Sequence, residues 1–201
     1  MSRKGFIGLG VMGSAMASHI SNKYSNIVVY NRTKDKANSW VEVNGGIAAT
    51  NAAQVGELCE HVFLCVGNDE DVETLVAGEE GIIQEMKRGG VIVDHTTTSA
   101  DVSMELSELC SKQGIGFIDA PVSGGQAGAE SGMLTVMAGG KKEYFDAVKE
   151  TIESYAKFIK LMGPSGSGQL TKMVNQICIA GLIQSLSEGL NFSESRIAHK
   201  R

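Results

Sequence analysis

Three glycines near the amino end of the chain have the spacing of a dinucleotide-binding turn. They follow an apolar run and precede small and apolar residues at helical spacing, which predicts a strand, a tight turn and a helix. The first glycine permits the sharp turn, the second lets bare backbone approach a pyrophosphate, and the third lets the helix pack closely against its strand. Unpaired N–H groups at the helix start attract phosphate. The alternative is an ordinary tight turn. The predicted phosphate site consists of Gly8, Leu9, Gly10, Val11, Met12 and Gly13.

A second polar group follows residues 27–30, an apolar run typical of a buried parallel strand. NAD sites usually have Asp or Glu at the end of this strand, where the carboxylate binds the ribose 2′-hydroxyl. This chain has Asn31, Arg32 and Thr33 there. A carboxylate would repel a 2′-phosphate, whereas an Arg fork with Asn and Thr donors suits one. We therefore predict NADP as the preferred cofactor. In the alternative, Arg32 is a solvated helix-start residue and Asn31 binds the 2′-hydroxyl of NAD.

Further turns follow the next predicted strands. Ligands of a doubly wound sheet lie beyond the carboxyl ends of its strands, so the turn Val66-Gly67-Asn68 should face the cofactor. Thr96 follows another strand, and the hydroxyl groups of its segment can face the cofactor or cap the next helix. Ser123, Gly124 and Gly125 follow a later strand and can form a backbone nest for a carboxylate. The alternative for this last segment is a plain surface connection.

The elements that hold these turns alternate along the chain. After the first strand, we predict strands at 27–30, 47–48, 61–66, 90–95, 116–120, 133–138 and 158–162. Helices are predicted at 14–24, 34–43, 51–59, 71–77, 100–113 and 142–155, and a flexible loop at 124–132. This order predicts an α/β fold with a doubly wound, Rossmann-type, mostly parallel sheet. We assign residues 1–164 to this NAD(P)-binding domain.

A long helical pattern covers residues 166–192 and should leave the nucleotide domain. At 1.5 Å per residue, roughly 25 residues reach about 40 Å, longer than the helices before it. We assign residues 165–201 to this helix and a polar tail. An apolar stripe on the helix needs a partner, so we expect a homo-oligomer formed through it. The stripe consists of Val174, Ile177, Cys178, Gly181, Leu182, Ser185, Leu186 and Leu190.

Composition argues against several partners. The 201 residues have a formal net charge of -5, which disfavours nucleic acid and anionic membranes. No apolar run approaches the roughly 20 residues that span a bilayer, and the amino end lacks a signal-peptide pattern. The cysteines and histidines lack zinc-site spacing, so we expect no metal. Reduced thiols fit a cytoplasmic protein.

Together the motifs resemble the β-hydroxyacid dehydrogenase family, which includes 3-hydroxyisobutyrate dehydrogenase, tartronate semialdehyde reductase and, more distantly, 6-phosphogluconate dehydrogenase. The resemblance rests on segments 6–20, 31–33 and 119–125 and on the pattern Gly166-x-Gly168-x-x-x-Lys172. It implies an oxidoreductase that interconverts a small β-hydroxyacid and its semialdehyde by hydride transfer with NAD(P).

The resemblance also implies roles for individual residues. By position, Lys172 would be the catalytic lysine, and Ser123, Gly124 and Gly125 would hold the substrate carboxylate. Gln176 stands where many relatives have Asn, one helical turn from the lysine, and either amide can bind the substrate. Judged without these motifs, Lys172 would be a solvated helix lysine.

Members of that family continue into an all-helical second domain that covers the substrate, whereas residues 193–201 are polar and unlike that continuation. The resemblance therefore implies that the chain is shortened and that residues 165–201 are a remnant of the helical domain. Two hypotheses follow: an active oxidoreductase, for which an oligomer that completes the site across subunits is one route, or an NADP-binding module with an incomplete active site and little or no turnover. A third is a scaffold without a ligand.

Overall fold

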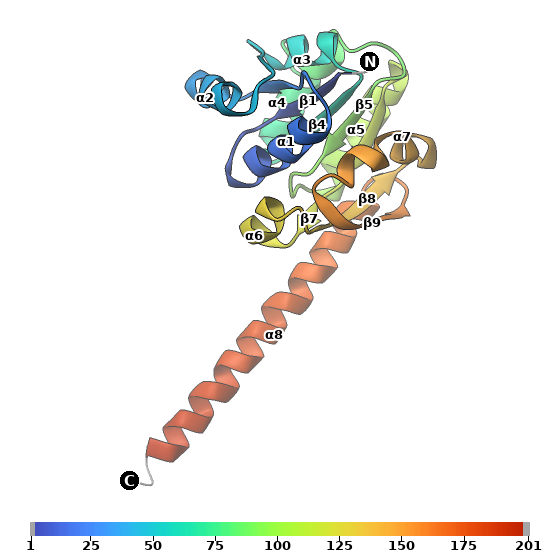
Figure 1. Cartoon of the computed structure of the whole chain (residues 1–201). Coiled ribbons are helices and arrows are strands. Elements are labelled where there is room, and N and C mark those ends of the chain that lie inside the picture. The colour runs from blue at the N-terminus through green and yellow to red at the C-terminus, as the bar shows by residue number, and fades with distance from the viewer. Residues whose placement is uncertain (1–2, 199–201) are drawn as a thin grey trace.

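Short apolar runs form strands whose successive residues point to opposite faces of one sheet. The computed structural model describes residues 3–198 (Figure 1). The strands are β1 (Lys4–Ile7), β2 (Val28–Tyr30), β3 (Ile47–Ala48), β4 (His61–Leu64), β5 (Val91–Asp94), β6 (Gly116–Asp119), β7 (Val122–Ser123), β8 (Leu134–Gly140) and β9 (Ala156–Gly163). The helices are α1 (Val11–Lys23), α2 (Lys34–Asn44), α3 (Ala52–Leu58), α4 (Asp69–Ala77), α5 (Ala100–Lys112), α6 (Gly125–Glu130), α7 (Lys142–Ile152) and α8 (Ser167–Ala198), with a 3-10 turn η1 (Ile82–Gln84). The predicted α/β fold is confirmed.

The strand order is β3-β2-β1-β4-β5-β6-β8-β7, and β9 lies beside β8. All pairs from β3 to β6 are parallel, whereas β8 runs antiparallel to β6 and β7 and parallel to β9. The sheet is therefore mostly parallel, as predicted. The chain winds outward from β1 in both directions, which leaves a crevice at the carboxyl ends of β1 and β4.

Two apolar cores lie on the two faces of the sheet. Phe6 and Phe63 face the core that contains residues of α1, α2 and α7. Their neighbours Ile7 and Val62 face the other core, with residues of α3, α4 and α5. Helices thus cover both faces of the sheet, so a ligand can reach the sheet at the turns that follow the strand ends.

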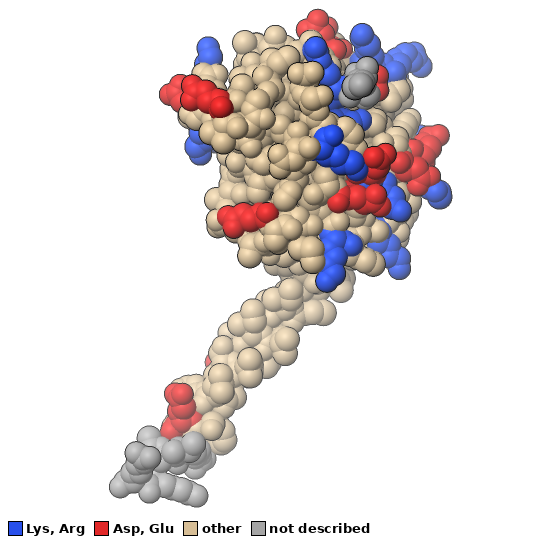
Figure 2. Space-filling view, in the orientation of Figure 1, with Lys and Arg blue, Asp and Glu red and all other residues tan. Residues whose placement is uncertain are grey.

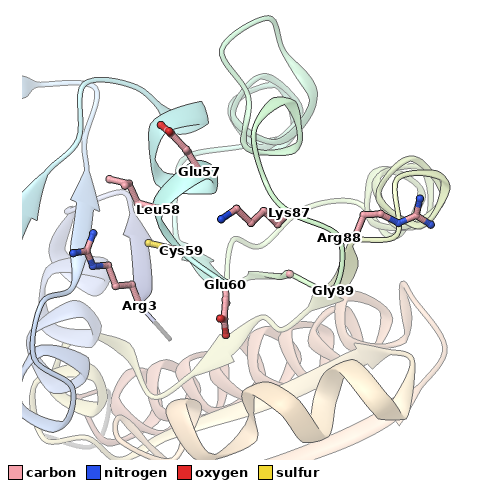
Figure 3. Close-up of a pocket in the computed structure, with 9 residues that line it drawn as sticks. Arg3, Glu57, Leu58, Cys59, Glu60, Lys87, Arg88 and Gly89 are labelled. Carbon is pink, nitrogen blue, oxygen red and sulfur yellow. The ribbon is translucent and has the colours of Figure 1, made fainter. Parts of the chain in front are cut away.

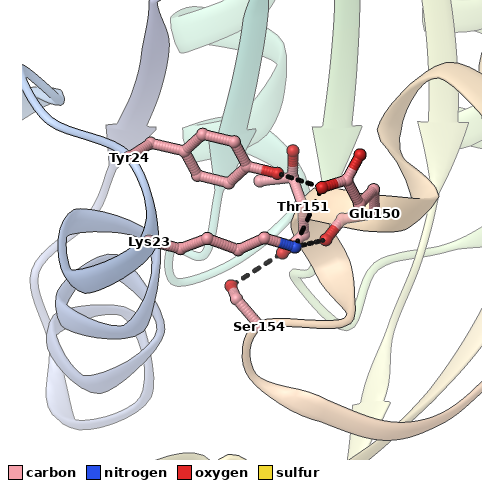
Figure 4. Close-up of polar contacts among 5 residues, drawn as sticks. All are labelled: Lys23, Tyr24, Glu150, Thr151 and Ser154. Atoms are coloured by element: carbon pink, nitrogen blue, oxygen red, sulfur yellow. Dashed lines mark hydrogen bonds and ion pairs between the residues drawn. The ribbon is translucent and has the colours of Figure 1, made fainter.

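The end of α1 is tied to α7 by polar contacts (Figure 4). Lys23 Nζ donates to the Glu150 carbonyl oxygen at 2.9 Å and lies 3.2 Å from the Glu150 carboxylate. Tyr24 donates its hydroxyl to the same carboxylate at 3.4 Å. These contacts join the helix after the glycine turn to the helix between β8 and β9.

The segment after β7 differs from the prediction. The expected loop at 124–132 contains the helix α6. Gly124 and Gly125 have φ values of 129° and 60°, which turn the chain into this helix. His19 Nε2 donates to the carbonyl oxygens of Ala129 and Glu130 at 3.0 and 3.1 Å, and Ala129 is buried. The loop prediction is wrong there because contacts with α1, far away in sequence, stabilise the helix.

Helix α8 leaves the body as a straight rod (Figure 1) and extends beyond the expected residue 192. Its 32 residues correspond to about 48 Å. Residues 173–187 contain no Asp, Glu, Lys or Arg, and the charged side chains gather on the body instead (Figure 2). Large apolar side chains such as Ile177 and Leu182 are exposed along the rod. Within residues 3–198, no helix combines the length and apolar character needed to cross a bilayer.

Candidate functional site

The glycine turn joins β1 to α1. Gly8 has φ 92° and donates its N–H to the Tyr30 carbonyl oxygen at 2.9 Å. A Cβ on Gly8 or Gly13 would overlap backbone oxygens, so both glycines are required for packing, whereas a Cβ on Gly10 would meet nothing within 4 Å. Helix α1 has no side-chain N-cap and no acidic residue in its first turn. Its first N–H groups are therefore available for an anion.

A cavity of about 440 Å³ opens beside this turn, at the carboxyl ends of β1, β2 and β4. Predicted cofactor residues from three separate segments line it. They are Gly8, Gly10, Asn31, Arg32, Thr33, Val66 and Gly67. The walls also include Tyr30, Lys36, Cys65, Asp71, Thr74 and Leu75, which the sequence prediction did not name. Among these, Lys36 could have been predicted from the sequence, because it lies one helical turn after Thr33 and should share its face of the helix.

Asn31 supports the turn from below. Its Oδ1 accepts the Leu9 N–H at 3.0 Å, and its Nδ2 donates to the Thr33 carbonyl oxygen at 3.1 Å. Both ends of the amide are therefore engaged within the protein. Arg32 is different, because its side chain is 88% exposed and its Nη1 lies 3.3 Å from Asp71 Oδ1. Arg32 thus remains at the mouth of the cavity.

The turn after β4 is held by the segment after β5. Val66 donates its N–H to Thr96 Oγ1 at 3.1 Å, and Asn68 caps α4 by accepting the Asp71 N–H at 2.9 Å. The Thr96 side chain is buried and lies beneath the turn. Thr96 therefore acts on the cavity through Val66 in this structure.

Ser123, Gly124 and Gly125 lie between β7 and α6. Ser123 pairs with Thr135 of β8, and both glycines are exposed. The positive φ values of Gly124 and Gly125 belong to the turn that opens α6. In Figure 1, β7 and α6 lie at the same end of the molecule as the start of α8.

Lys172 and Gln176 lie on the first turns of α8. Lys172 is half-buried, and burial lowers the pKa of its ammonium from the usual 10.5. Among residues 3–198 it has no ion-pair partner. Gln176 is exposed, and its Oε1 accepts from Asn175 Nδ2 at 3.1 Å. Within the same residues, no hydrogen bond joins Lys172 to the Ser123 turn.

Two buried side chains anchor the start of α8, and the sequence prediction missed both. Asp119 accepts the N–H groups of Gly166 and Gln169 at 2.8 and 3.1 Å. Burial raises the pKa of Asp119, although these N–H groups oppose the rise. The Gln169 amide accepts the Thr98 N–H at 3.2 Å and donates to the Thr96 carbonyl oxygen at 2.7 Å. Through Thr96, the helix that carries Lys172 is linked to the turn at Val66 that lines the cavity. Asp119 lies in segment 119–125, and Gln169 lies within the pattern Gly166-x-Gly168-x-x-x-Lys172. Their places in these motifs could have indicated a role for both residues.

A second cavity, of about 530 Å³, lies at the opposite edge of the sheet (Figure 3). Arg3, Glu60 and Gly90, which line it, precede β1, β4 and β5. Ligands of doubly wound sheets bind at the carboxyl ends of the strands, not at this edge. None of the predicted site residues lines it. Within the described residues, no cluster of His, Cys, Asp and Glu could hold a metal ion.

Known proteins similar to this chain include dinucleotide-binding domains and oxidoreductases. Residues 3–163 match the family described as the NAD binding domain of 6-phosphogluconate dehydrogenase. An uncharacterized oxidoreductase of Shewanella frigidimarina is 52% identical over 97% of this chain and 67% of its own length. The probable 3-hydroxyisobutyrate dehydrogenase-like 2, mitochondrial, of Arabidopsis thaliana is 38% identical over 96% of this chain and 64% of its own.

A similar solved structure contains a bound nucleotide. Psf3 in complex with NADP+ and 2-OPP superposes with a TM-score of 0.84 at 27% identity, over 94% of this chain and 68% of that one. Across the curated relatives above, the chain spans about two thirds of their length.

Proposed function

Because the chain belongs to the family of the NAD-binding domain of 6-phosphogluconate dehydrogenase, we propose that it is an oxidoreductase that interconverts a small β-hydroxyacid and its semialdehyde. The observation that carries the proposal is the uncapped start of α1, which opens with the glycine turn onto one cavity at the sheet's carboxyl edge. Backbone N–H groups at such a helix start bind a pyrophosphate.

NADP is the preferred cofactor in this proposal. Arg32 and Lys36 bring two positive charges to the cavity, and Thr33 adds a hydroxyl group. Such groups suit a 2′-phosphate. The amide of Asn31 is engaged with the turn, which speaks against its use for the 2′-hydroxyl of NAD. The NADP+ complex of Psf3 supports the same choice.

Bound NADP supplies the hydride acceptor for oxidation of the hydroxyacid, and NADPH the hydride donor for reduction of the semialdehyde. The chain's own residues must hold the substrate and move one proton at its oxygen. We assign the substrate carboxylate to the backbone of Ser123, Gly124 and Gly125. Gln176 contributes a hydrogen bond one helical turn from Lys172.

Lys172 handles the proton. In oxidation, its neutral amine takes the proton of the substrate hydroxyl group; in reduction, its ammonium returns that proton to the carbonyl oxygen. Burial lowers the pKa of Lys172, so the fraction of neutral amine near neutral pH is larger than for an ordinary lysine. The ammonium also stabilises negative charge that develops on the oxygen.

A second candidate function is an NADP-binding module with little or no turnover. The observation that favours it is the exposure of Gly124, Gly125 and Gln176 beside a bare rod, because water then reaches the substrate side of the site. A second copy packed along α8 would cover that side. We therefore include a homo-oligomer formed through α8 in the first proposal.

The test has a binding arm and a turnover arm. Calorimetry with NADP+ and NAD+ measures the nucleotide site, and NADPH oxidation is then followed with methylmalonate, tartronate and succinate semialdehydes. We expect NADP+ binding and turnover of at least one semialdehyde, with Lys172→Ala reducing turnover by about 100-fold or more at unchanged NADP+ affinity. Lys157→Ala, an exposed lysine on β9, is the matched control.

The outcomes separate the candidates. Equal rates for the wild type and Lys172→Ala would remove Lys172 from the mechanism. NADP+ binding without turnover of any semialdehyde would favour the binding module. Absence of dinucleotide binding would refute both.

A further inference from the structure

A carboxylate already occupies the cavity that we assign to the 2′-phosphate. Asp71 stands in the first turn of α4, and its side chain is 32% exposed. Its Oδ1 lies 3.3 Å from Arg32 Nη1. Its Oδ2 lies 2.6 Å from the point where a Cβ on Gly67 would stand. Bare backbone at Gly67 therefore leaves room for this carboxylate beside the nucleotide turn.

The position of Asp71 is built into the fold. Its N–H is bound by the Asn68 cap at 2.9 Å, so the residue is held at the start of α4. Arg32, Lys36 and Asp71 are the charged residues that line the cavity within the described chain. The two cations come from the end of β2 and the start of α2, whereas the anion comes from the first turn of α4.

The three charges have opposite consequences for the two nucleotides. A 2′-phosphate must approach Arg32 while the Asp71 carboxylate stands 3.3 Å from the same guanidinium. Two anions then compete for one cation, and the 2′-phosphate gains less from Arg32 while Asp71 is paired with it. A ribose 2′-hydroxyl brings no negative charge, so it does not compete with Asp71 for Arg32. The Arg32–Asp71 pair therefore opposes NADP and leaves NAD unaffected.

We infer that Asp71 sets the ratio of NADP to NAD affinity by pairing with Arg32 in the nucleotide-free protein. This inference rests on the proposed function, because it requires the nucleotide to lie in this cavity. NAD sites usually carry such a carboxylate at the end of the second strand. Here the carboxylate of Asp71 reaches the same cavity from α4. It reduces the difference between NADP and NAD affinity that Arg32 and Lys36 create.

Calorimetric titration of the whole chain with NADP+ and with NAD+ tests the inference. Asp71→Asn should lower the Kd for NADP+ by about two- to fivefold, the range expected for an exposed ion pair, and leave the Kd for NAD+ within about twofold. Glu70→Gln is the matched control, because it removes the same charge from the same helical turn at an exposed position that does not line the cavity.

Arg32→Ala variants show whether Asp71 acts through Arg32. Combined with Arg32→Ala, Asp71→Asn should no longer improve NADP+ binding. An equal improvement with and without Arg32 would overturn the inference, because Asp71 would then act by general repulsion.

The remaining outcomes distinguish this inference from the proposed function. If the wild type binds NADP+ and Asp71→Asn leaves the ratio of the two affinities unchanged, only the role of Asp71 is overturned. If the wild type binds neither nucleotide, the proposed function fails and the role of Asp71 fails with it.

Discussion

Asp94→Asn should make the protein progressively more stable than the wild type as the pH rises from about 4 to about 8. Asp94 ends β5 and is fully buried, and burial raises the pKa of its carboxyl from 3.8 to about 7. Its Oδ1 accepts the Thr96 N–H at 2.8 Å, while Oδ2 has no hydrogen-bond partner among the described residues. The ionised carboxylate of Asp94 is therefore less stable in the native state than in the unfolded chain.

The sign follows from proton binding in the two states. As the pH rises from 3.8, the unfolded chain releases the Asp94 proton first, while the native state keeps it until about pH 7. The native state binds more protons across this window, so stability falls as the pH rises and levels off above it. A pKa rise from 3.8 to about 7, at about 1.4 kcal/mol per pKa unit, corresponds to a loss of about 4 kcal/mol.

The half-buried His61 and the buried His95 act in the opposite direction. Burial lowers the pKa values of His61 and His95 from 6.5 to about 4. The unfolded chain binds their protons more readily between these values, so their contribution to stability rises with pH. The wild-type curve therefore mixes opposing effects. The difference between Asp94→Asn and the wild type cancels the histidine contribution.

Urea unfolding at a series of pH values measures this difference. The free energy of unfolding of Asp94→Asn minus that of the wild type should grow by about 4 kcal/mol across the window. The amide in place of Oδ2 adds a constant offset only. Asp101→Asn, the same change at an exposed position of α5, is the control. A constant difference between Asp94→Asn and the wild type across the range would refute the reasoning.

Three further predictions concern the turn, the anchor and the rod. Gly13→Ala should lower the thermal midpoint sharply because its Cβ overlaps backbone, whereas Gly10→Ala should keep the midpoint and weaken NADP+ binding by about tenfold, measured by calorimetry. Gln169→Ala should lower the free energy of urea unfolding by about 2–5 kcal/mol, because the Thr98 N–H and the Thr96 carbonyl oxygen lose their hydrogen-bond partner. The control Gln184→Ala, at an exposed position, should leave this free energy unchanged. Sedimentation velocity should show self-association that Ile177→Glu reduces; a monomeric wild type at high concentration would contradict this.

Most of the fold follows from local sequence. Buried strands such as β4 and β5 are continuous apolar runs, and the glycine turn has its own spacing signal. The helix α6 was missed because its sequence, Gly-Gln-Ala-Gly-Ala-Glu, contains two glycines that weaken a helix. His19 and the burial of Ala129 compensate, and both depend on α1. The division of the chain at residue 164 stays a prediction.

The candidate site divides in the same way. The sequence identified Arg32 and Thr33 beside the turn, because they directly follow a strand. It did not identify Asp71, which reaches Arg32 from 39 residues further along the chain. It also missed the roles of Asp119 and Gln169, which join α8 to β6 and to the β5–α5 connection. The roles of Lys172 and the Ser123 turn stay predictions.

By itself, the sequence determined the alternation of strands and helices, the tight glycine turn after β1 and the absence of an acidic residue directly after β2. These are local properties, set by residue type and spacing along a few consecutive positions. Only the tertiary structure decided that Asn31 supports the turn, that Asp71 faces Arg32 and that Gln169 connects α8 to Thr96. Such pairings depend on which strands lie side by side, and strand order places residues together that no local pattern relates.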